Sequence, residues 1–256
     1  MKESWHADRI EEPEEFWQEE RLDPSAAFQA TGCIEISGKG RRKLKVDVAV
    51  EERIKIVIDG TAVAELFCLP SELEELAVGF LVCEGLVEGP ADIVSVQSEG
   101  KSLICERRGQ RGEENFHRVV SDLKMNPETI FGALDLLNQE ARLWRRTGGT
   151  HSALVLREGG GIASFCEDVS RSSAVDKAVG SALLAGTDLS RCAMITTGRL
   201  SSVIVAKVAR AGFPIVVSRA APLNAGIDLA KRLGMTLAAF ARRPKLHVYS
   251  GDGRIL

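Results

Sequence analysis

The C-terminal third of the chain alternates short apolar runs with longer amphipathic ones, and this alternation limits the fold more than any other feature. The pattern predicts strands at 191–196, 214–218 and 235–240, with helices at 201–212 and 222–234 between them. Residues 245–250 have the pattern of an additional edge strand. Strands that alternate with helices in this way are joined by right-handed crossovers and run parallel. We therefore expect an α/β sheet.

The loops that follow parallel strands gather at one edge of the sheet, where open α/β sheets bind ligands. Here those loops are 197–202, 218–224 and 241–245. They hold five cationic side chains, which we call the anion rim: Arg199, Arg219, Arg242, Arg243 and Lys245. Two helices begin after these loops, and their free amide groups also favour anions. The rim predicts a phosphate-binding site, and the alternative is that its arginines only solubilise surface loops.

The first half of the chain predicts a smaller unit. Alternating apolar residues indicate strands at 43–50 and 54–58, a turn at Asp59-Gly60, and a second hairpin around Glu99-Gly100. Pro70 opens a helix that Gly85 closes. Residues 29–115 are therefore expected to form a small, mostly antiparallel α+β subdomain, followed by an α/β domain at 125–256. The second domain begins with a helix at 127–144 and two strands within 151–167.

Charge is distributed unevenly along the chain. Residues 1–28 contain nine acidic and three basic residues, a net charge of −6, whereas the whole chain carries −3 and the remainder therefore +3. We expect a solvated, disordered acidic arm at 1–28, and the alternative is an arm that docks through Trp5 and Trp17. A mildly basic body suits an anionic small molecule but is too weakly charged to bind duplex nucleic acid.

Several classes of site and location are excluded by missing patterns. There is no dinucleotide-binding glycine motif after a strand and no P-loop. A zinc deaminase needs a His-x-Glu motif and a Pro-Cys-x-x-Cys motif. The six cysteines lie at least 15 residues apart, and His151 is followed by Ser152-Ala153, so both motifs are missing and no zinc is expected. No apolar run is long enough to span a bilayer, and the N-terminus lacks a signal-peptide core, which makes the cytoplasm the expected location.

Two short segments can carry chemistry. In "RTGGTHSA" (146–153), Gly148 and Gly149 allow a ligand to approach the backbone, with His151 at the head of a strand. The alternative for His151 is a hydrogen-bonded core residue. In "CEDVSRSSAVDKAVG" (166–180), Ser173 and Asp176 have the spacing of a helix-capping box. A helix start does not explain the charged residues in this segment: Glu167, Asp168, Arg171 and Lys177.

Five blocks taken in order resemble the formate dehydrogenase accessory protein (FdhD) family: "LPSELEELAVGFLVCEGLV", "RTGGTHSALV", "EDVSRSSAVDKAVG", "TTGRLSSVIVAKVARAGFPIVVSRAAPLNAGIDLA" and "MTLAAFARRPKLHVYSGDGRI". The resemblance implies a cytoplasmic homodimer whose α/β domain is a cytidine-deaminase-like, three-layer domain with a mixed sheet and no zinc. It implies a sulfur carrier between a cysteine desulfurase and the molybdenum guanine-dinucleotide cofactor, which activates formate dehydrogenase.

The resemblance also assigns site residues. The family's cofactor-contacting stretch corresponds to Phe240, Ala241, Arg242, Arg243, Pro244 and Lys245, which overlaps the anion rim. The blocks around Arg199, Ser201, Asp168 and Arg171 would line the same pocket. Arg219, Gly148, Gly149 and His151 complete the candidate cofactor-binding set.

This sequence departs from the family where the sulfur chemistry would lie. The family's Cys-x-x-Cys loop is replaced by "ENFHRVVSDLKMNPETI", and Ser170, Ser172 and Ser173 stand where the family has glycine, histidine and asparagine. No matched residue supplies the reactive thiolate. Cys166 is the remaining candidate because it adjoins a block placed in the pocket, and the alternative is a buried structural thiol.

Two hypotheses follow from these patterns. The first is a maturation factor that carries sulfur to the molybdenum cofactor of formate dehydrogenase or another molybdoenzyme. The second is a binding-only relative that holds a guanine-nucleotide-bearing ligand, or chaperones a molybdoenzyme, without transferring sulfur.

Overall fold

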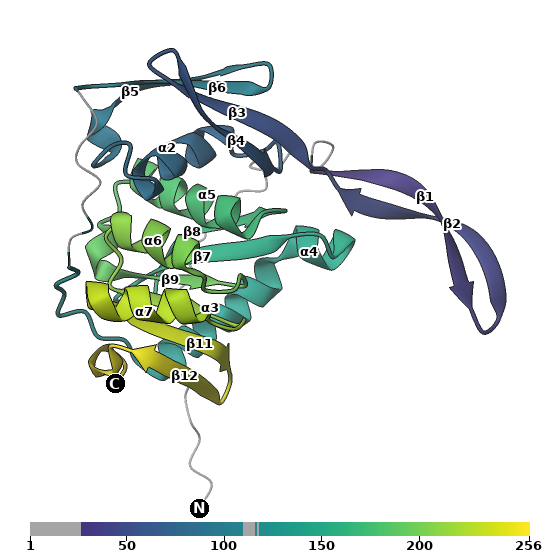
Figure 1. Ribbon diagram of the computed structural model, residues 1–256. Helices are drawn as coiled ribbons and strands as arrows, with labels where there is room; N and C mark the ends of the chain where they lie inside the picture. Colours follow the sequence, from purple (N-terminus) through teal and green to yellow (C-terminus); the bar gives the residue numbers. More distant parts are fainter. Residues whose placement is uncertain (1–26, 110–115, 117) are drawn as a thin grey trace, which may run out of the picture.

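A computed structural model of the chain describes residues 27–109, 116 and 118–256. A six-stranded sheet lies at its centre (Figure 1), built from β7 (His151–Arg157), β8 (Ile162–Asp168), β9 (Cys192–Thr196), β10 (Ile215–Ser218), β11 (Thr236–Arg242) and β12 (Lys245–Ser250). The strand order is β12-β11-β10-β9-β7-β8. The three strands β9, β10 and β11 are parallel, as their alternation with helices predicted. β12 and the β7–β8 hairpin pair antiparallel to them, which makes the sheet mixed.

Helices cover both faces of this sheet. α5 (Arg171–Leu184), α6 (Ser202–Arg210) and α7 (Asn224–Leu233) lie on one face, and α3 (Pro127–Glu140) lies on the other. Successive residues of a strand point to opposite faces, so Val216 packs with the three helices while Ile215 and Val217 pack with α3. The mixed α/β architecture expected from the sequence is therefore confirmed.

The expected helix at 127–144 is in fact two helices, which corrects the sequence prediction. α3 ends at Glu140, Ala141 leaves the helical region with φ −67° and ψ 66°, and α4 (Arg142–Thr147) begins after it. The carboxylate of Glu167 accepts hydrogen bonds from the amides of Leu143 and Trp144, both at 2.9 Å. A side chain distant in sequence thus caps the second helix and stabilises the break.

The smaller unit contains a four-stranded sheet and one helix. The strands are β3 (Glu52–Ile58), β4 (Thr61–Cys68), β5 (Ile93–Glu99) and β6 (Ser102–Arg107), in the order β4-β3-β6-β5. Two antiparallel hairpins are joined by a parallel pairing of β3 with β6. The helix α2 (Leu73–Cys83) packs on this sheet and begins at Leu73, three residues after the expected Pro70. Short 3₁₀ helices occupy Pro90–Asp92, Leu189–Arg191 and Asp252–Arg254.

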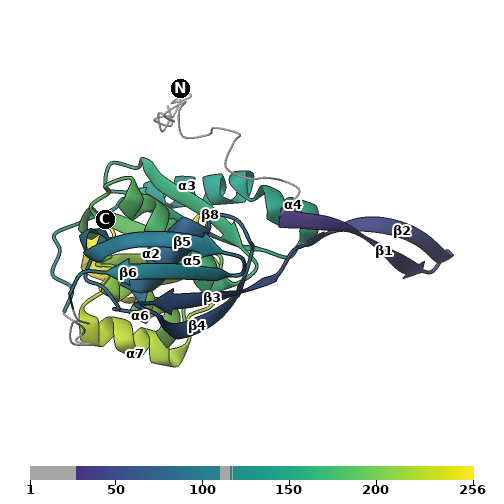
Figure 2. The same cartoon turned by 90° about the horizontal axis from the view of Figure 1, so that it is seen from above.

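A close helix crossing joins the two units (Figure 2). α2 lies against α5, and each contributes a glycine at the contact. A Cβ atom on Gly79 would lie 1.7 Å from the carbonyl oxygen of Asp176, and one on Gly180 would lie 1.9 Å from that of Glu75. Only glycine fits at either position, so this crossing fixes the smaller sheet over the helical layer of the larger one.

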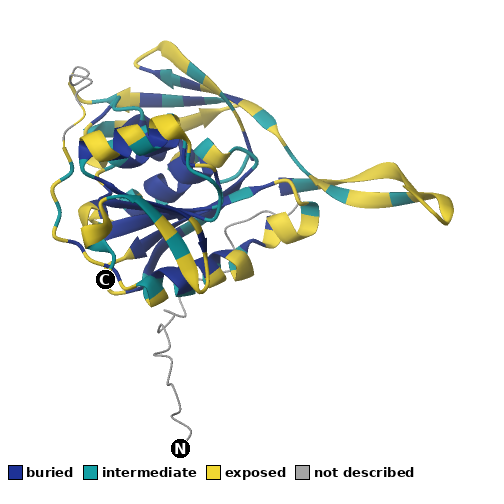
Figure 3. Ribbon diagram, turned by 60° about the horizontal axis from the view of Figure 1, so that its bottom comes forward, coloured by how far each residue is buried: buried dark blue, intermediate teal, exposed yellow. Residues whose placement is uncertain are grey.

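The remaining two strands form a separate hairpin, which we call the arm. Within the part of the chain that the structure describes, β1 (Phe28–Ser37) and β2 (Gly40–Ala49) pair only with each other, and they project from the body. Figure 3 shows that the arm is largely exposed, in contrast to the buried central sheet. The sequence predicted a strand near β2 but assigned 29–115 to one unit, because an exposed hairpin lacks a core-facing pattern.

The acidic N-terminal segment, predicted at 1–28 and distinct from the β1–β2 arm, lies outside the described residues except for Ala27 and Phe28. Among the helices that the structure describes, none is long and apolar enough to cross a membrane.

Candidate functional site

The carboxyl edge of the parallel strands gathers the segments that the sequence singled out. The loops after β9 and β10 are joined by hydrogen bonds from the amide of Leu200 to the carbonyl of Ala221 (3.1 Å) and from that of Leu223 to Leu200 (2.9 Å). The amide of Phe240, at the end of β11, bonds to the carbonyl of Ala220 (3.1 Å). Because β7 runs antiparallel to β9, His151 begins at this same edge. The three loops and the start of β7 form one continuous surface.

The five cations of the anion rim have different surroundings. Arg243 pairs with Glu128 and Asp135 of α3 and lies over the ring of Phe131, 5.4 Å from its centroid. Arg219 donates a hydrogen bond to the side chain of Asn138, also on α3. A ligand would have to compete with these contacts.

The other three rim residues are exposed: Arg199, Arg242 and Lys245. None of them forms an ion pair with another described residue. The part of the rim that is not already engaged by α3 is therefore smaller than the sequence indicated.

His151 lies half-buried beside two arginines. Its Nδ1 atom is 3.3 Å from the hydroxyl oxygen of Thr197. Burial lowers the pKa of this imidazole, and the nearby positive charges of Arg171 and Arg199 lower it further. The neutral form of His151 is thus favoured, and a bound anion would oppose the influence of the two arginines.

Arg171 reaches this edge because of a glycine in the neighbouring loop. It is exposed at the first position of α5, and a Cβ atom on Gly198 would lie 2.9 Å from its own Cβ. The candidate residue Ser201 caps α6, where its hydroxyl oxygen accepts from the amide of Ile204 at 3.5 Å.

The glycines before β7 serve the local fold. Gly148 ends α4 with a left-handed φ of +68°, and its amide donates to the carbonyl of Trp144 at 2.7 Å. A Cβ atom on Gly149 would lie 3.2 Å from the Cβ of Ala49, at the base of the arm. Both glycines shape the chain that leads to His151 and connect it to the arm.

Asp168 is fully buried and makes all of its polar contacts within the protein. Its carboxylate lies 2.7 Å from Nζ of Lys177, also fully buried, and accepts from the amides of Leu69 (3.1 Å) and Ser170 (2.8 Å). Burial raises the pKa of this carboxyl, and Lys177 opposes the rise. Asp168 therefore holds the segment before α2 against the start of α5.

The helix start within 166–180 differs from the sequence prediction. Ser170 caps α5, and its hydroxyl accepts from the amide of Ser173 at 3.4 Å. Asp176 lies in the second turn, where both carboxylate oxygens are 2.9 Å from Nζ of Lys207. The expected capping box of Ser173 and Asp176 was wrong because the helix begins earlier and Asp176 has a buried partner on α6.

Cys166 is buried, with 2% of its surface exposed. Its thiol donates a hydrogen bond to Glu72 at 3.5 Å. Burial and the carboxyl of Glu72 raise the pKa of the Cys166 thiol well above its usual value, and burial raises that of Glu72 to about 7. The thiolate that sulfur chemistry needs is disfavoured here.

All six cysteines lie in the described residues, and Cys33 on the arm is the exposed one. Burial raises the pKa of Cys68 to about 12 and of Cys105 and Cys192 to about 11. The sequence did not single out Cys33, because nothing in its neighbours distinguishes it from the other isolated cysteines.

A cleft of about 420 Å³ opens between β4, α2 and the N-terminal ends of α5 and α6. We call it the acidic cleft, and its lining is Glu51, Glu65, Leu66, Phe67, Phe80, Glu84, Ser170, Ser172, Ser173, Asp176, Val203 and Lys207. Ser170, Ser172 and Ser173, the serines that depart from the family pattern, all line it. The cleft could not be predicted from the sequence, because its walls come from both structural units.

Comparisons with known proteins agree with this architecture. The sequence model of the FdhD/NarQ family matches residues 49–118 and 104–256. Sulfur carrier protein FdhD of Methanothermobacter thermautotrophicus is 34% identical over 235 residues, covering 84% of this chain and 94% of that protein. The protein of the same name from Wolinella succinogenes is 33% identical over 237 residues, covering 82% of each chain.

A solved structure gives the same result. The crystal structure of a formate dehydrogenase accessory protein from Desulfotalea psychrophila superposes with a TM-score of 0.82 at 29% sequence identity. The match covers 90% of this chain and all of that one.

Proposed function

This chain belongs to the FdhD/NarQ family, and from that premise we propose that it serves formate dehydrogenase maturation as a sulfur carrier. It receives sulfur from a cysteine desulfurase and passes it to the molybdenum guanine-dinucleotide cofactor. The observation that carries this proposal is the similarity to proteins named sulfur carriers over more than four-fifths of their length. The proposal includes a cytoplasmic homodimer and a cytidine-deaminase-like larger domain.

The carboxyl edge suits the diphosphate part of such a cofactor. Arg171, Arg199, Arg242 and Lys245 are exposed there, and guanidinium groups donate paired hydrogen bonds to phosphate oxygens. The His151 ring offers a further hydrogen-bonding group beside them. The cofactor, when bound, supplies the molybdenum centre that accepts sulfur, while these residues hold its anionic end.

The 240–245 segment would contact the nucleotide part. Phe240 is exposed and packs edge-on against His247, with ring centroids 5.9 Å apart, which leaves an aromatic surface beside Arg242. Ala241 is fully buried, so only its backbone is available. Arg243 would bind the nucleotide only after giving up its ion pairs with Glu128 and Asp135 of α3.

Sulfur carriage needs a reachable thiolate. The thiolate attacks the terminal sulfur of the desulfurase persulfide, a new S–S bond forms, and the desulfurase cysteine leaves as a thiolate. Cys33 is accessible for this attack as the protein stands. Cys166 becomes accessible only if the contact with Glu72 opens.

The buried thiols favour a second candidate function. Five of the six cysteines are buried, and the family's paired cysteines are missing from the sequence. A relative that binds a guanine-nucleotide-bearing cofactor, or chaperones its client, without carrying sulfur would have this arrangement.

Incubation with a cysteine desulfurase and isotopically labelled cysteine separates the two functions. The first predicts a mass gain of one sulfur atom on the chain, released when molybdenum cofactor is added. Binding of guanosine diphosphate without sulfur uptake would support the second function. A chain that neither takes up sulfur nor binds the nucleotide would contradict both.

The rim contribution is measured by calorimetry with guanosine diphosphate at fixed salt. Replacing Arg199 and Arg242 with alanine removes charged hydrogen bonds, each contributing about 1.5–3 kcal/mol, and therefore weakens binding roughly tenfold or more per residue. The matched control is alanine at Lys231 and Arg232, which lie in the last turn of α7. Equal affinity in the two double variants would remove the rim from the site.

A further inference from the structure

The arm is anchored at its base and is largely exposed farther out. Nε of Arg146 lies 2.7 Å from Asp47, and its guanidinium lies 3.6 Å from the ring centroid of Phe28. Farther out, Ile34 and Ile36 are 56% and 67% exposed. An isolated two-stranded sheet is at best marginally stable in water, and its unpaired edges favour association.

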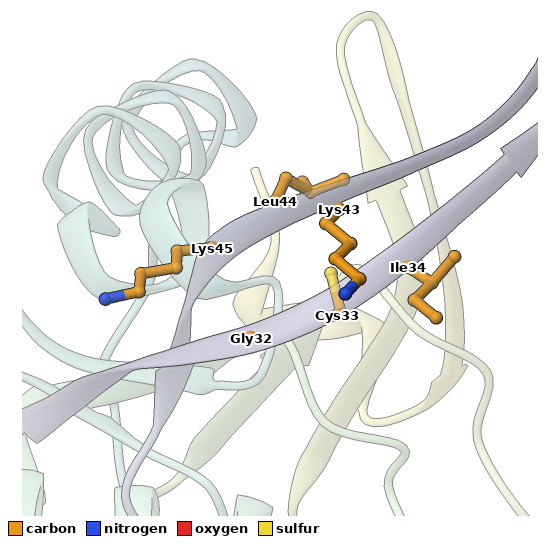
Figure 4. Close-up of a pocket in the computed structure, with 6 residues that line it drawn as sticks. All are labelled: Gly32, Cys33, Ile34, Lys43, Leu44 and Lys45. Carbon is orange, nitrogen blue, oxygen red and sulfur yellow. The ribbon is translucent and has the colours of Figure 1, made fainter.

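One face of the arm combines apolar and basic side chains. Ile36 pairs with Arg41 and Ile34 with Lys43 in the β1–β2 register, and Lys45 follows two residues later on the same face. We call these five residues the arm face. Figure 4 shows Ile34, Lys43 and Lys45 at the middle of the hairpin.

The acidic cleft has the complementary character. Glu51 and Glu65 stand at its wall, and Glu65 forms an exposed ion pair with Arg53 at 3.6 Å, which a cationic partner would have to displace. Phe67 and Val203 are 55% and 56% exposed beside them. The cation in the cleft, Lys207, is already paired with Asp176 and Glu84. The cleft lies next to β4, an edge strand of the smaller sheet.

We propose that the arm face of one copy docks in the acidic cleft of a second copy, and that the exchange is reciprocal. The arm cannot fold back on its own cleft, because Glu51 lies in the segment between β2 and β3 at the base, whereas the tip of a ten-residue hairpin lies roughly 30 Å away. Isoleucines then meet Phe67 and Val203, and lysines meet glutamates.

The area is sufficient for a stable dimer. A hairpin roughly 33 Å long and 10 Å wide offers about 330 Å² per face. In a reciprocal exchange each subunit contributes both an arm and a cleft, or roughly 700 Å² per partner, close to the 800 Å² of a standard interface. A two-fold symmetric pair of such contacts closes the assembly at two copies.

Charge reversal with mixing tests the exchange by light scattering after size exclusion. Arg41→Glu with Lys43→Glu reverses the arm, and Glu51→Lys with Glu65→Lys reverses the cleft. Each double variant alone should associate roughly a hundredfold more weakly, because like charges oppose each other. An equimolar mixture should form heterodimers, since both of its arm–cleft contacts pair opposite charges.

The control is Lys231→Glu with Arg232→Glu on α7, which should remain dimeric. A monomeric wild type, a dimeric arm variant or a mixture that stays monomeric would overturn the proposal. Hydrogen exchange of the arm amides identifies other partners of the arm face. Protection that does not depend on protein concentration, in a monomer, would mean that residues 1–26 of the same chain cover the arm face. Absence of protection would mean that the arm face binds a different protein. The exchange rests on the homodimer included in the proposed function, but the measurement uses neither nucleotide nor sulfur donor, so its failure is distinct from failure of sulfur carriage or nucleotide binding.

Discussion

Replacing Asp168 with asparagine should destabilise the protein without weakening nucleotide binding. The carboxylate is fully buried, 2.7 Å from Nζ of Lys177, and also accepts from two backbone amides. Asparagine keeps the size and one acceptor but removes the negative charge. Lys177, which is fully buried, would then have no counter-charge here and only neutral acceptors, the amide oxygen and the carbonyl of Leu69 at 3.1 Å.

The expected loss is about 3–5 kcal/mol in the free energy of unfolding, the usual cost of leaving one member of a buried ion pair without its partner. This is a large share of the roughly 5–15 kcal/mol that stabilises a typical domain. The matched control is Asp47→Asn, which breaks the partly exposed pair with Arg146 and should cost at most about 1 kcal/mol.

Urea denaturation of both variants measures the difference. Combining Asp168→Asn with Lys177→Met should restore much of the stability, because an uncharged pair of similar volume needs no buried counter-charge. A loss below about 1 kcal/mol for Asp168→Asn alone, or a tenfold loss of nucleotide affinity with unchanged stability, would refute the structural role given to this residue.

Three further predictions follow from buried groups. Burial raises the pKa of Glu72 to about 7, so the folded state holds this proton more tightly than the unfolded state. The free energy of unfolding should therefore fall as pH rises from about 5 to 8. Glu72→Gln should flatten that part of the pH profile measured by urea denaturation, and an unchanged slope would contradict the assignment. Iodoacetamide with peptide mass mapping should label Cys33 quickly and Cys166 only on unfolding, and equal rates would be inconsistent with the burial of Cys166. Gly180→Ala should lower stability by about 1–3 kcal/mol in thermal melts, because the Cβ of alanine would lie 1.9 Å from the carbonyl oxygen of Glu75. This loss outweighs the better helix propensity of alanine. A more stable variant would mean that α2 and α5 separate easily.

Local periodicity predicted the larger sheet well. β9, β10 and β11 each carry a short buried run between amphipathic helices, and that pattern is a property of neighbouring residues. It also placed the loop that carries Arg199 at the carboxyl edge of the parallel strands, because crossover handedness fixes where such loops lie.

Contacts between distant residues could not be predicted in the same way. The break before α4 depends on Glu167, and the position of Asp176 depends on Lys207, 31 residues away. Arg243 looked available as a rim cation because its acidic partners on α3 lie more than 100 residues earlier. Sequence spacing identified the charges at the site but not which of them are already paired.

The central claim is sulfur carriage in formate dehydrogenase maturation, and enzyme activation tests it most directly. Formate dehydrogenase produced without its accessory protein would be incubated with a cysteine desulfurase, cysteine and this chain, and formate oxidation followed over time. We predict that activity appears only when the chain is present and falls when Arg199 and Arg242 are both alanine. Equal activation without the chain, or no activation by a chain that binds guanosine diphosphate, would contradict sulfur carriage.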